Sequence, residues 1–242
     1  MSVRILLVDD HQLMRQGLRS ILEDELGFEL VGEASSGRDA VRMAAELQPT
    51  IVIMDVAMPG LNGIEATRQI KEHDPRVGVI ALSSYSDRRY VLAILGAGAD
   101  GYVLKAGAYD DLRRAVRAVS GGNRFLCPEV AGIVVDATLA GASTAAPAAD
   151  DAAAGDFDEV DGAPAEVAAG VGSAFKLLGP REREVLQLVA EGFTSAEIAA
   201  RLHVSPSTVD THRRNLMRKV GLRNAADVTR YAIREGLVSP EQ

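Results

Sequence analysis

Hydrophobic residues in the first half of the chain follow two different spacings. Short apolar runs of strand length occur at residues 3–8, 29–33, 50–54, 77–82 and 101–104. Between these runs, apolar residues recur every three or four positions, as on one face of residues 12–25. The first spacing is typical of buried strands and the second of amphipathic helices. Five repeats of strand then helix predict an α/β domain over residues 1–125, with a doubly wound, five-stranded parallel sheet.

Capping residues support the predicted helices. Ser36 followed by Asp39, and Asn62 followed by Glu65, are typical of helix starts where a side chain accepts from a free backbone N–H group. The fifth helix carries Leu112, Val116 and Val119 on one face and is expected to stop at glycines 121–122.

Residues 176–242 show only helical spacing. Pro180 is expected in the first turn of one helix, and Thr194 with Glu197 forms a capping box for a short second helix. Ser205 opens a third helix that ends at Gly221, and a fourth helix follows Asn224. A tight turn between the second and third helices is typical of a helix-turn-helix unit. A small all-α domain of four helices is therefore predicted.

The middle of the chain, residues 126–175, is predicted to be a linker. A helix is expected at 128–139, followed by a flexible Ala- and Gly-rich acidic segment. The net charge is −2 over residues 1–125, −9 over the linker and +3 over residues 176–242, within a total of −8. The linker is interpreted as a spacer. The alternative is that the acidic segment screens the basic C-terminal domain. The DNA affinity of the unphosphorylated protein after deletion of residues 148–168 distinguishes a spacer from a screening segment.

Composition narrows the class of protein. The apolar runs are too short to cross a bilayer, and Asp9 and Asp10 interrupt any signal-peptide pattern. The single cysteine, Cys127, excludes an internal disulfide and fits a reducing cytosol, so a cytoplasmic protein without membrane contact is expected. Cys127 itself is interpreted as a small packing residue rather than a redox sensor.

Polar residues follow four of the predicted strands: Asp9 and Asp10, Asp55, Ser83 and Lys105. Because ligands bind outside the carboxyl ends of parallel strands, these side chains are expected at one rim of the sheet. Crowded carboxylates are tolerated when they hold a hard cation, and Mg²⁺ fits an oxygen-rich site that also receives a phosphoryl group. Ser83 and Lys105 could each contact a phosphoryl oxygen.

The motifs around these residues resemble receiver domains of response regulators. They are residues 8–11 (VDDH), 54–60 (MDVAMPG) and 101–105 (GYVLK). The resemblance implies that Asp55 is the phosphoacceptor and that Mg²⁺ is held by Asp9, Asp10, Asp55 and the backbone carbonyl of Ala57. It also implies that Ser83 and Lys105 stabilise the phosphoryl group.

Ser83 and Tyr102 are implied as a switch pair, in which the hydroxyl moves inward and the aromatic ring turns into the vacated space. For Tyr102, a half-buried strand aromatic without a switch role is the alternative. Two residues depart from the usual pattern, Ser83 in place of threonine and Ala106 in place of a polar residue or proline.

The C-terminal motifs resemble LuxR-type DNA-binding domains, and the two halves together resemble the NarL/FixJ class of response regulators. These motifs are residues 178–186 (LGPREREVL), 197–199 (EIA) and 205–212 (SPSTVDTH). The third helix is then expected in the major groove. The candidate DNA contacts on it are Ser207, Thr208, Thr211, His212, Arg213, Arg214, Arg218 and Lys219. Asp210 departs from relatives that carry a base-contacting lysine; it would repel phosphate or accept from a cytosine amino group.

The expected protein is a two-component response regulator rather than an enzyme, because it would catalyse only the phosphorylation and dephosphorylation of its own aspartate. Its expected partners are a sensor histidine kinase, promoter DNA, a second copy of the chain on activation and RNA polymerase. One alternative is a magnesium-dependent phosphohydrolase, but the nucleophile there follows the first strand. The other is a regulator that does not depend on phosphorylation, either a ligand-gated LuxR-type protein or one with a degenerate receiver. The intact set of Asp9, Asp10, Asp55, Ser83 and Lys105 argues against degeneracy.

Overall fold

The computed structural model describes residues 2–143, 177–222, 224–234 and 237–238 of the chain. The acidic segment predicted to be flexible lies almost entirely outside the described residues. None of the helices in the described part has the length and apolar character needed to span a membrane.

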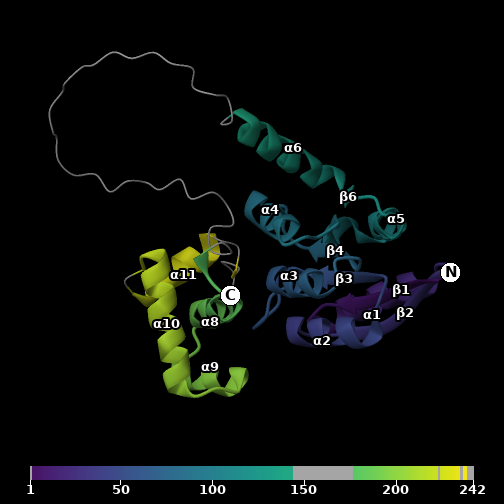
Figure 1. Cartoon of the computed structure of the whole chain (residues 1–242). Coiled ribbons are helices and arrows are strands. Elements are labelled where there is room, and N and C mark those ends of the chain that lie inside the picture. Colours follow the sequence, from purple (N-terminus) through teal and green to yellow (C-terminus); the bar gives the residue numbers. More distant parts are fainter. Residues whose placement is uncertain (1, 144–176, 223, 235–236, 239–242) are drawn as a thin grey trace, which may run out of the picture.

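The N-terminal half alternates strands and helices as predicted (Figure 1). Its elements are β1 (Val3–Val8), α1 (Gln12–Glu23), β2 (Phe28–Ala34), α2 (Gly37–Leu47), β3 (Ile51–Asp55), α3 (Gly63–His73), β4 (Gly78–Ser83), α4 (Arg88–Gly96), β5 (Gly101–Leu104) and α5 (Ala108–Ser120). The predicted caps are present, since Ser36 accepts from the backbone N–H of Asp39 and Asn62 from that of Glu65.

The sheet is parallel with the order β2-β1-β3-β4-β5-β6. It contains six strands where five were predicted. The additional strand, β6 (Phe125–Leu126), pairs with Gly101 and Tyr102 of β5. Two residues are too few to show an alternating pattern in the sequence, so this strand could be recognised only from its partner.

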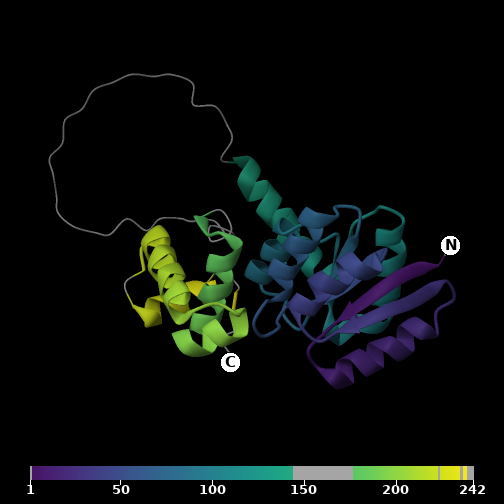
Figure 2. The same ribbon diagram turned by 60° about the horizontal axis from the view of Figure 1, so that its bottom comes forward.

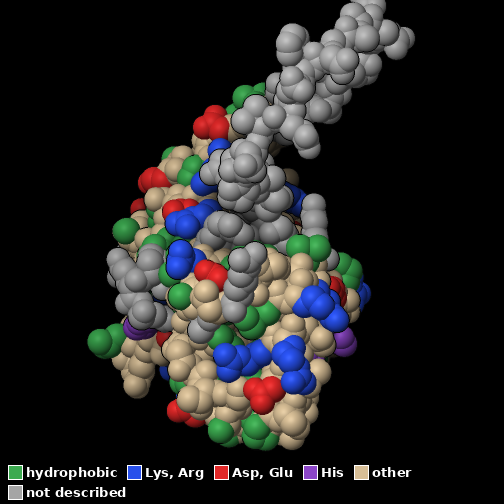
Figure 3. All heavy atoms as spheres, turned by 90° about the vertical axis from the view of Figure 1, so that its left-hand side faces the viewer, with side chains coloured by type: hydrophobic (Ala, Val, Ile, Leu, Met, Phe, Trp, Pro, Cys, Tyr) green, Lys and Arg blue, Asp and Glu red, His purple; other side chains and the backbone are tan. Residues whose placement is uncertain are grey.

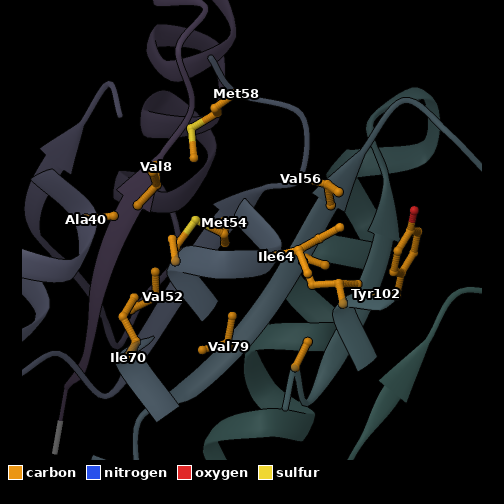
Figure 4. Packing of buried hydrophobic residues seen from close by; sticks show 14 of the residues in the cluster. Val8, Ala40, Val52, Met54, Val56, Met58, Ile64, Ile70, Val79 and Tyr102 are labelled. Atoms are coloured by element: carbon orange, nitrogen blue, oxygen red, sulfur yellow. The ribbon is translucent and has the colours of Figure 1, made fainter. Parts of the chain in front are cut away.

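Each strand directs alternate side chains to opposite faces of the sheet, as the two-residue period requires. On one face, Leu6, Val52 and Val79 pack against α2, α3 and α4; on the other, Leu7, Ile53 and Ile80 pack against α1 and α5. Figure 4 shows part of the first face, with Val52, Ile70 and Val79 deep in the layer and Met58 at its rim. The central strands β3 and β4 are buried on both faces, which explains their uninterrupted apolar runs.

The helix that follows β6, α6 (Pro128–Ser143), extends away from the sheet (Figure 1). It contacts α4, and its Val130 is buried in the core beneath it. Its later residues Val135 and Leu139 are exposed. The helix therefore begins as part of the α/β domain and continues beyond it.

The C-terminal domain consists of α8 (Pro180–Ala190), α9 (Ser195–Leu202), α10 (Pro206–Val220) and α11 (Ala225–Arg234). Thr194 forms the predicted capping box with Glu197, and Ser205 caps α10. The turn between α9 and α10 contains His203 in a left-handed conformation. A separate hydrophobic core, which includes Val185, Leu216 and Tyr231, holds the four helices together.

Candidate functional site

Four of the predicted site residues meet at the carboxyl end of the sheet. The Nζ atom of Lys105 lies 2.7 Å from Asp9 Oδ2 and 2.8 Å from Asp55 Oδ2. Asp9, Asp55 and Ser83 are buried, with 2% or less of their surface exposed, whereas Asp10 is partly exposed. The strand ends thus bring two carboxylates, an ammonium and a hydroxyl to the rim, as the topology requires.

Burial raises the pKa of Asp55 to about 6, although the charge of Lys105 acts in the opposite direction. Burial also opposes the charge of Lys105, but the adjacent Asp55 and Asp9 hold its pKa above the ordinary value. At neutral pH the rim therefore carries an ionised but poorly solvated Asp55 carboxylate beside a fixed cation. A positively charged group placed beside such a carboxylate stabilises its ionised form.

The carboxylate oxygens at the rim fit a hard divalent cation. One ligand atom from each of Asp9, Asp10, His11 and Asp55 lies within 4.8 Å of the others. Asp10 Oδ1 is buried and accepts no hydrogen bond within the described residues. Lys105 Nζ lies 2.7 Å from Asp9 Oδ2, and His11 Nδ1 lies 2.9 Å from Asp10 Oδ1. Carboxylate oxygens are ligands that Mg²⁺ prefers, so the residues present suit this ion.

The loop after Asp55 folds closely over the nucleophile. The backbone N–H of Ala57 donates to Asp55 Oδ1 at 3.3 Å, which places Ala57 next to the carboxylate. Gly63, at the end of this loop, has no room for a side chain, since a Cβ there would lie 1.9 Å from the Asp55 carbonyl oxygen. The path of the loop therefore depends on this glycine and on the Asn62 cap.

Tyr102 is fully buried rather than half-buried. Its hydroxyl donates to the Tyr85 carbonyl at 2.6 Å, and Ser83 Oγ accepts from the Tyr85 backbone N–H at 3.0 Å. Burial raises the pKa of Tyr102 to about 12. The β4–α4 loop thus connects the two residues of the predicted switch pair, and the ring already lies inside in this structure.

Most of the predicted DNA contacts are exposed on α10. Ser207, Thr208, Thr211, Arg214 and Arg218 are exposed, and His212 and Arg213 are half-buried. Figure 3 views the molecule from the side on which α10 lies in Figure 1, and Lys and Arg side chains are spread over that face. Lys219 differs from the others because its Nζ lies 2.6 Å from Glu182, so it ties α10 to α8.

The two domains contact each other through the loop that follows Asp55. In Figures 1 and 2, α8 lies between α10 and the α/β domain. Gln187 of α8 donates to the Met58 carbonyl and accepts from the Asn62 backbone N–H, while the Gly60 N–H donates to Glu191. The loop that follows Asp55 is thus held along its length by one helix of the C-terminal domain.

Charged pairs flank these contacts. Arg183 Nε donates to Glu65 Oε2 at 2.8 Å, and both side chains are less than 5% exposed. Burial opposes the charge of Glu65, but hydrogen bonds from Arg68 and Arg183 hold its pKa below the ordinary value. Arg38 pairs with Glu184 at the edge of the contact.

A second set of contacts involves the C-terminal residues. Asn62 Nδ2 donates to the Leu237 carbonyl at 3.2 Å, and the Tyr90 hydroxyl donates to the Val238 carbonyl at 3.0 Å. Tyr90 stacks on Tyr85, with ring centroids 5.2 Å apart. Contacts therefore run from Tyr102 through Tyr85 and Tyr90 to the C-terminal domain.

Two family models match this chain. Residues 5–117 match the response regulator receiver domain, and residues 176–232 match the luxR family of bacterial regulatory proteins. Response regulator protein VraR of Staphylococcus aureus is 31% identical over 238 residues, which cover 98% of this chain and all of the relative. The chain is a LuxR/NarL-family response regulator. It is accordingly a DNA-binding transcription regulator of a two-component system, and the phosphohydrolase alternative finds no support.

Solved structures agree with this family. A two-component response regulator of the LuxR family from Aurantimonas is 34% identical, with a TM-score of 0.55 over 57% of this chain and 99% of that chain. The response regulator RcsB in complex with DNA is 26% identical, with a TM-score of 0.54 over 97% of this chain and 99% of that chain. A further RcsB structure, 25% identical, contains two dimers on two parallel DNAs.

Sequence reasoning did not identify the contacts between the domains. Glu65 and Asn62 were recognised only as helix-start residues, and Arg183 only as part of a family motif. The sequence alone gave no signal of these contacts, because polar residues on one side of a helix usually face water. Residues 181–187 of α8 carry four polar or charged side chains that become buried, namely Glu182, Arg183, Glu184 and Gln187. His11 was also not assigned, although its side chain lies beside both acidic residues that precede it.

Proposed function

We propose that this response regulator accepts a phosphoryl group on Asp55 in a Mg²⁺-dependent reaction with a histidine kinase, and that this step controls its pairing on promoter DNA. The buried Asp55 carboxylate between Lys105 and the oxygens of Asp9 and Asp10 carries the proposal. Asp9, Asp10, Asp55 and the Ala57 carbonyl would hold Mg²⁺. When bound, the ion offsets the repulsion between the nucleophile and the incoming phosphoryl group.

The residues of the rim have separate tasks in this reaction. Asp55 attacks the phosphorus atom of the donor through one carboxylate oxygen, and the donor's leaving group departs on the opposite side. Lys105 Nζ, which lies 2.8 Å from Asp55 Oδ2, would donate to a phosphoryl oxygen once the group is transferred. Ser83 would donate its hydroxyl to another phosphoryl oxygen. That movement ends its contact with the Tyr85 backbone and alters the β4–α4 loop.

The same event would loosen the contact between the domains. A phosphoryl group on Asp55 adds negative charge next to a loop whose Met58, Gly60 and Asn62 backbone groups hold α8. To invert a 1:99 balance between docked and released forms, phosphorylation must favour release by about 5.5 kcal/mol. Loss of several hydrogen bonds between the domains, together with pairing of the released domains on DNA, would supply a free energy of this order.

Docking does not act by covering the recognition helix. The N-terminal and middle residues of α10 are exposed while α8 is docked. The restraint would instead fix the orientation of the DNA-binding domain, so that two copies cannot place their recognition helices on adjacent half-sites. The relatives found on DNA as dimers support this form of control.

The remaining partners follow from the proposed reaction. The chain would act in the cytoplasm, where a histidine kinase and promoter DNA are both accessible, and RNA polymerase would be contacted at the promoter. It would not be an enzyme in the ordinary sense, because it turns over only its own phosphoryl group.

The decisive experiment compares DNA binding by wild type and Asp55→Asn, with and without Mg²⁺ and a small phosphodonor. Asparagine keeps the shape of the side chain but cannot accept the phosphoryl group. The donor should tighten DNA binding only for the wild type and only with Mg²⁺. Equal binding by both proteins in every condition would overturn phosphorylation control at Asp55 and would favour a regulator that does not depend on phosphorylation.

A further inference from the structure

Helix α10 carries one acidic side chain among four basic ones. Asp210 is the only acid from Pro206 to Val220, while Arg213, Arg214, Arg218 and Lys219 follow it. It lies in the N-terminal part of the helix, which contacts base edges in a helix-turn-helix complex. DNA phosphates repel a carboxylate, so Asp210 weakens sequence-independent binding.

The position of Asp210 is fixed by the preceding helix. The Ser195 hydroxyl, in the first turn of α9, donates to Asp210 Oδ1 at 2.7 Å. The Ser195 Oγ atom accepts in turn from Arg213 Nη1 at 3.0 Å, so that arginine is turned toward α9. Asp210 is exposed, and its Oδ2 accepts no hydrogen bond from any residue that the structure describes. One carboxylate oxygen is therefore anchored and the other remains an acceptor.

We infer that Asp210 is a base-reading residue that selects cytosine at one position of the DNA half-site. This inference rests on the proposed DNA binding through α10. In the major groove, guanine and thymine present acceptors, which repel a carboxylate. Adenine offers an amino group that lies between two acceptors, its own N7 and thymine O4. The cytosine amino group has an acceptor on only one side, so it is the donor that a fixed carboxylate oxygen discriminates best.

A purely structural role for Asp210 predicts a different result. If the side chain only braced Ser195 and Arg213, its charge would have no effect on which base is preferred. Asp210→Asn separates the two, because the amide oxygen can still accept from Ser195 while the free end of the side chain now contains a donor. An amide with one donor and one acceptor matches adenine N6 and N7.

The experiment is selection of bound sequences from a randomised DNA library by the full chain with a small phosphodonor and Mg²⁺. Four proteins are compared: wild type, Asp210→Asn, Ser195→Ala and Asp227→Asn. The last variant removes the same charge from the same domain but outside α10. Wild type and Asp227→Asn should enrich cytosine at the same position. Asp210→Asn should lose about tenfold of that preference and move toward adenine.

Ser195→Ala should keep the preference for cytosine but weaken it, because the carboxylate is then free to rotate. Identical base preferences for wild type and Asp210→Asn, with both proteins bound to DNA, would overturn the inference and leave Asp210 as a bracing residue. Failure of all four proteins to bind any DNA would instead overturn the proposed function, and the inference with it.

Discussion

Replacement of Glu65 by alanine tests the contact between the domains most directly. In the docked arrangement Glu65 accepts from Arg183, and only 4% of the Arg183 side chain is exposed. Loss of the carboxylate leaves the guanidinium buried without its acidic partner. A hydrogen bond to a charged group contributes about 1.5–3 kcal/mol, which corresponds to about 10–150-fold in an equilibrium constant. Because undocking returns Arg183 to water, this cost should appear in the docking equilibrium rather than in unfolding.

The control is Glu72→Ala on the same helix. Both Glu65 and Glu72 pair with Arg68, but Glu72 is 63% exposed and, within the described residues, forms no hydrogen bond or ion pair across the domain boundary. Small-angle scattering of the unphosphorylated full chain should show a larger radius of gyration for Glu65→Ala and no change for Glu72→Ala. The same Glu65 variant should bind target DNA more tightly than wild type without a phosphodonor.

An unchanged radius of gyration and unchanged DNA affinity for Glu65→Ala would refute this reasoning. The ion pair would then contribute nothing to the position of the DNA-binding domain. A drop in the unfolding temperature shared by Glu65→Ala and Glu72→Ala would report only the lost pairing with Arg68, and it would not count as evidence for docking.

Three further predictions concern the site and the linker. Folding raises the pKa of Asp55 from 3.8 to about 6, so the ionised carboxylate destabilises the folded state as pH rises through this range. Above pH 6 and without Mg²⁺, Asp55→Asn should therefore have a free energy of unfolding in urea about 1–3 kcal/mol higher than wild type. Equal urea midpoints at pH 7.5 would contradict this. Gly63→Ala should destabilise the fold by about 1–3 kcal/mol because its Cβ would clash with the Asp55 carbonyl, whereas Gly17→Ala, with open space around it, should not, as thermal unfolding will show. Deletion of residues 148–168 should leave the DNA affinity of the unphosphorylated protein unchanged; a gain in affinity would support screening by the acidic segment instead.

The parts of the fold that depend on local pattern were predictable from the sequence. The five longer strands follow from apolar runs, and the caps at Ser36, Asn62, Thr194 and Ser205 from residue types that satisfy free N–H groups. The meeting of Asp9, Asp55, Ser83 and Lys105 also follows, because parallel strands place all their carboxyl ends on one edge.

Features that depend on a distant surface were not predictable. Residues 125–126 form a strand only because β5 offers an unpaired edge. Arg183 and Gln187 lie on the polar side of an amphipathic helix, where a solvated face is the ordinary expectation. Their burial is decided by the β3–α3 loop and the first turn of α3, more than a hundred residues earlier in the chain.

The chemistry of the domain contact suits a reversible switch. Helix α8 directs Val185 and Leu186 into its own core and presents polar side chains to the receiver, so undocking exposes groups that water solvates well. A buried ion pair contributes little net stability over hydrated partners, but its geometry specifies one arrangement. An apolar face at Arg183 and Gln187 would hold the domains together more firmly and would lose the coupling to the backbone groups of Met58 and Asn62. Polar contacts placed on the loop that follows Asp55 would keep docking weak enough to reverse and, under the proposed function, sensitive to the chemistry at Asp55.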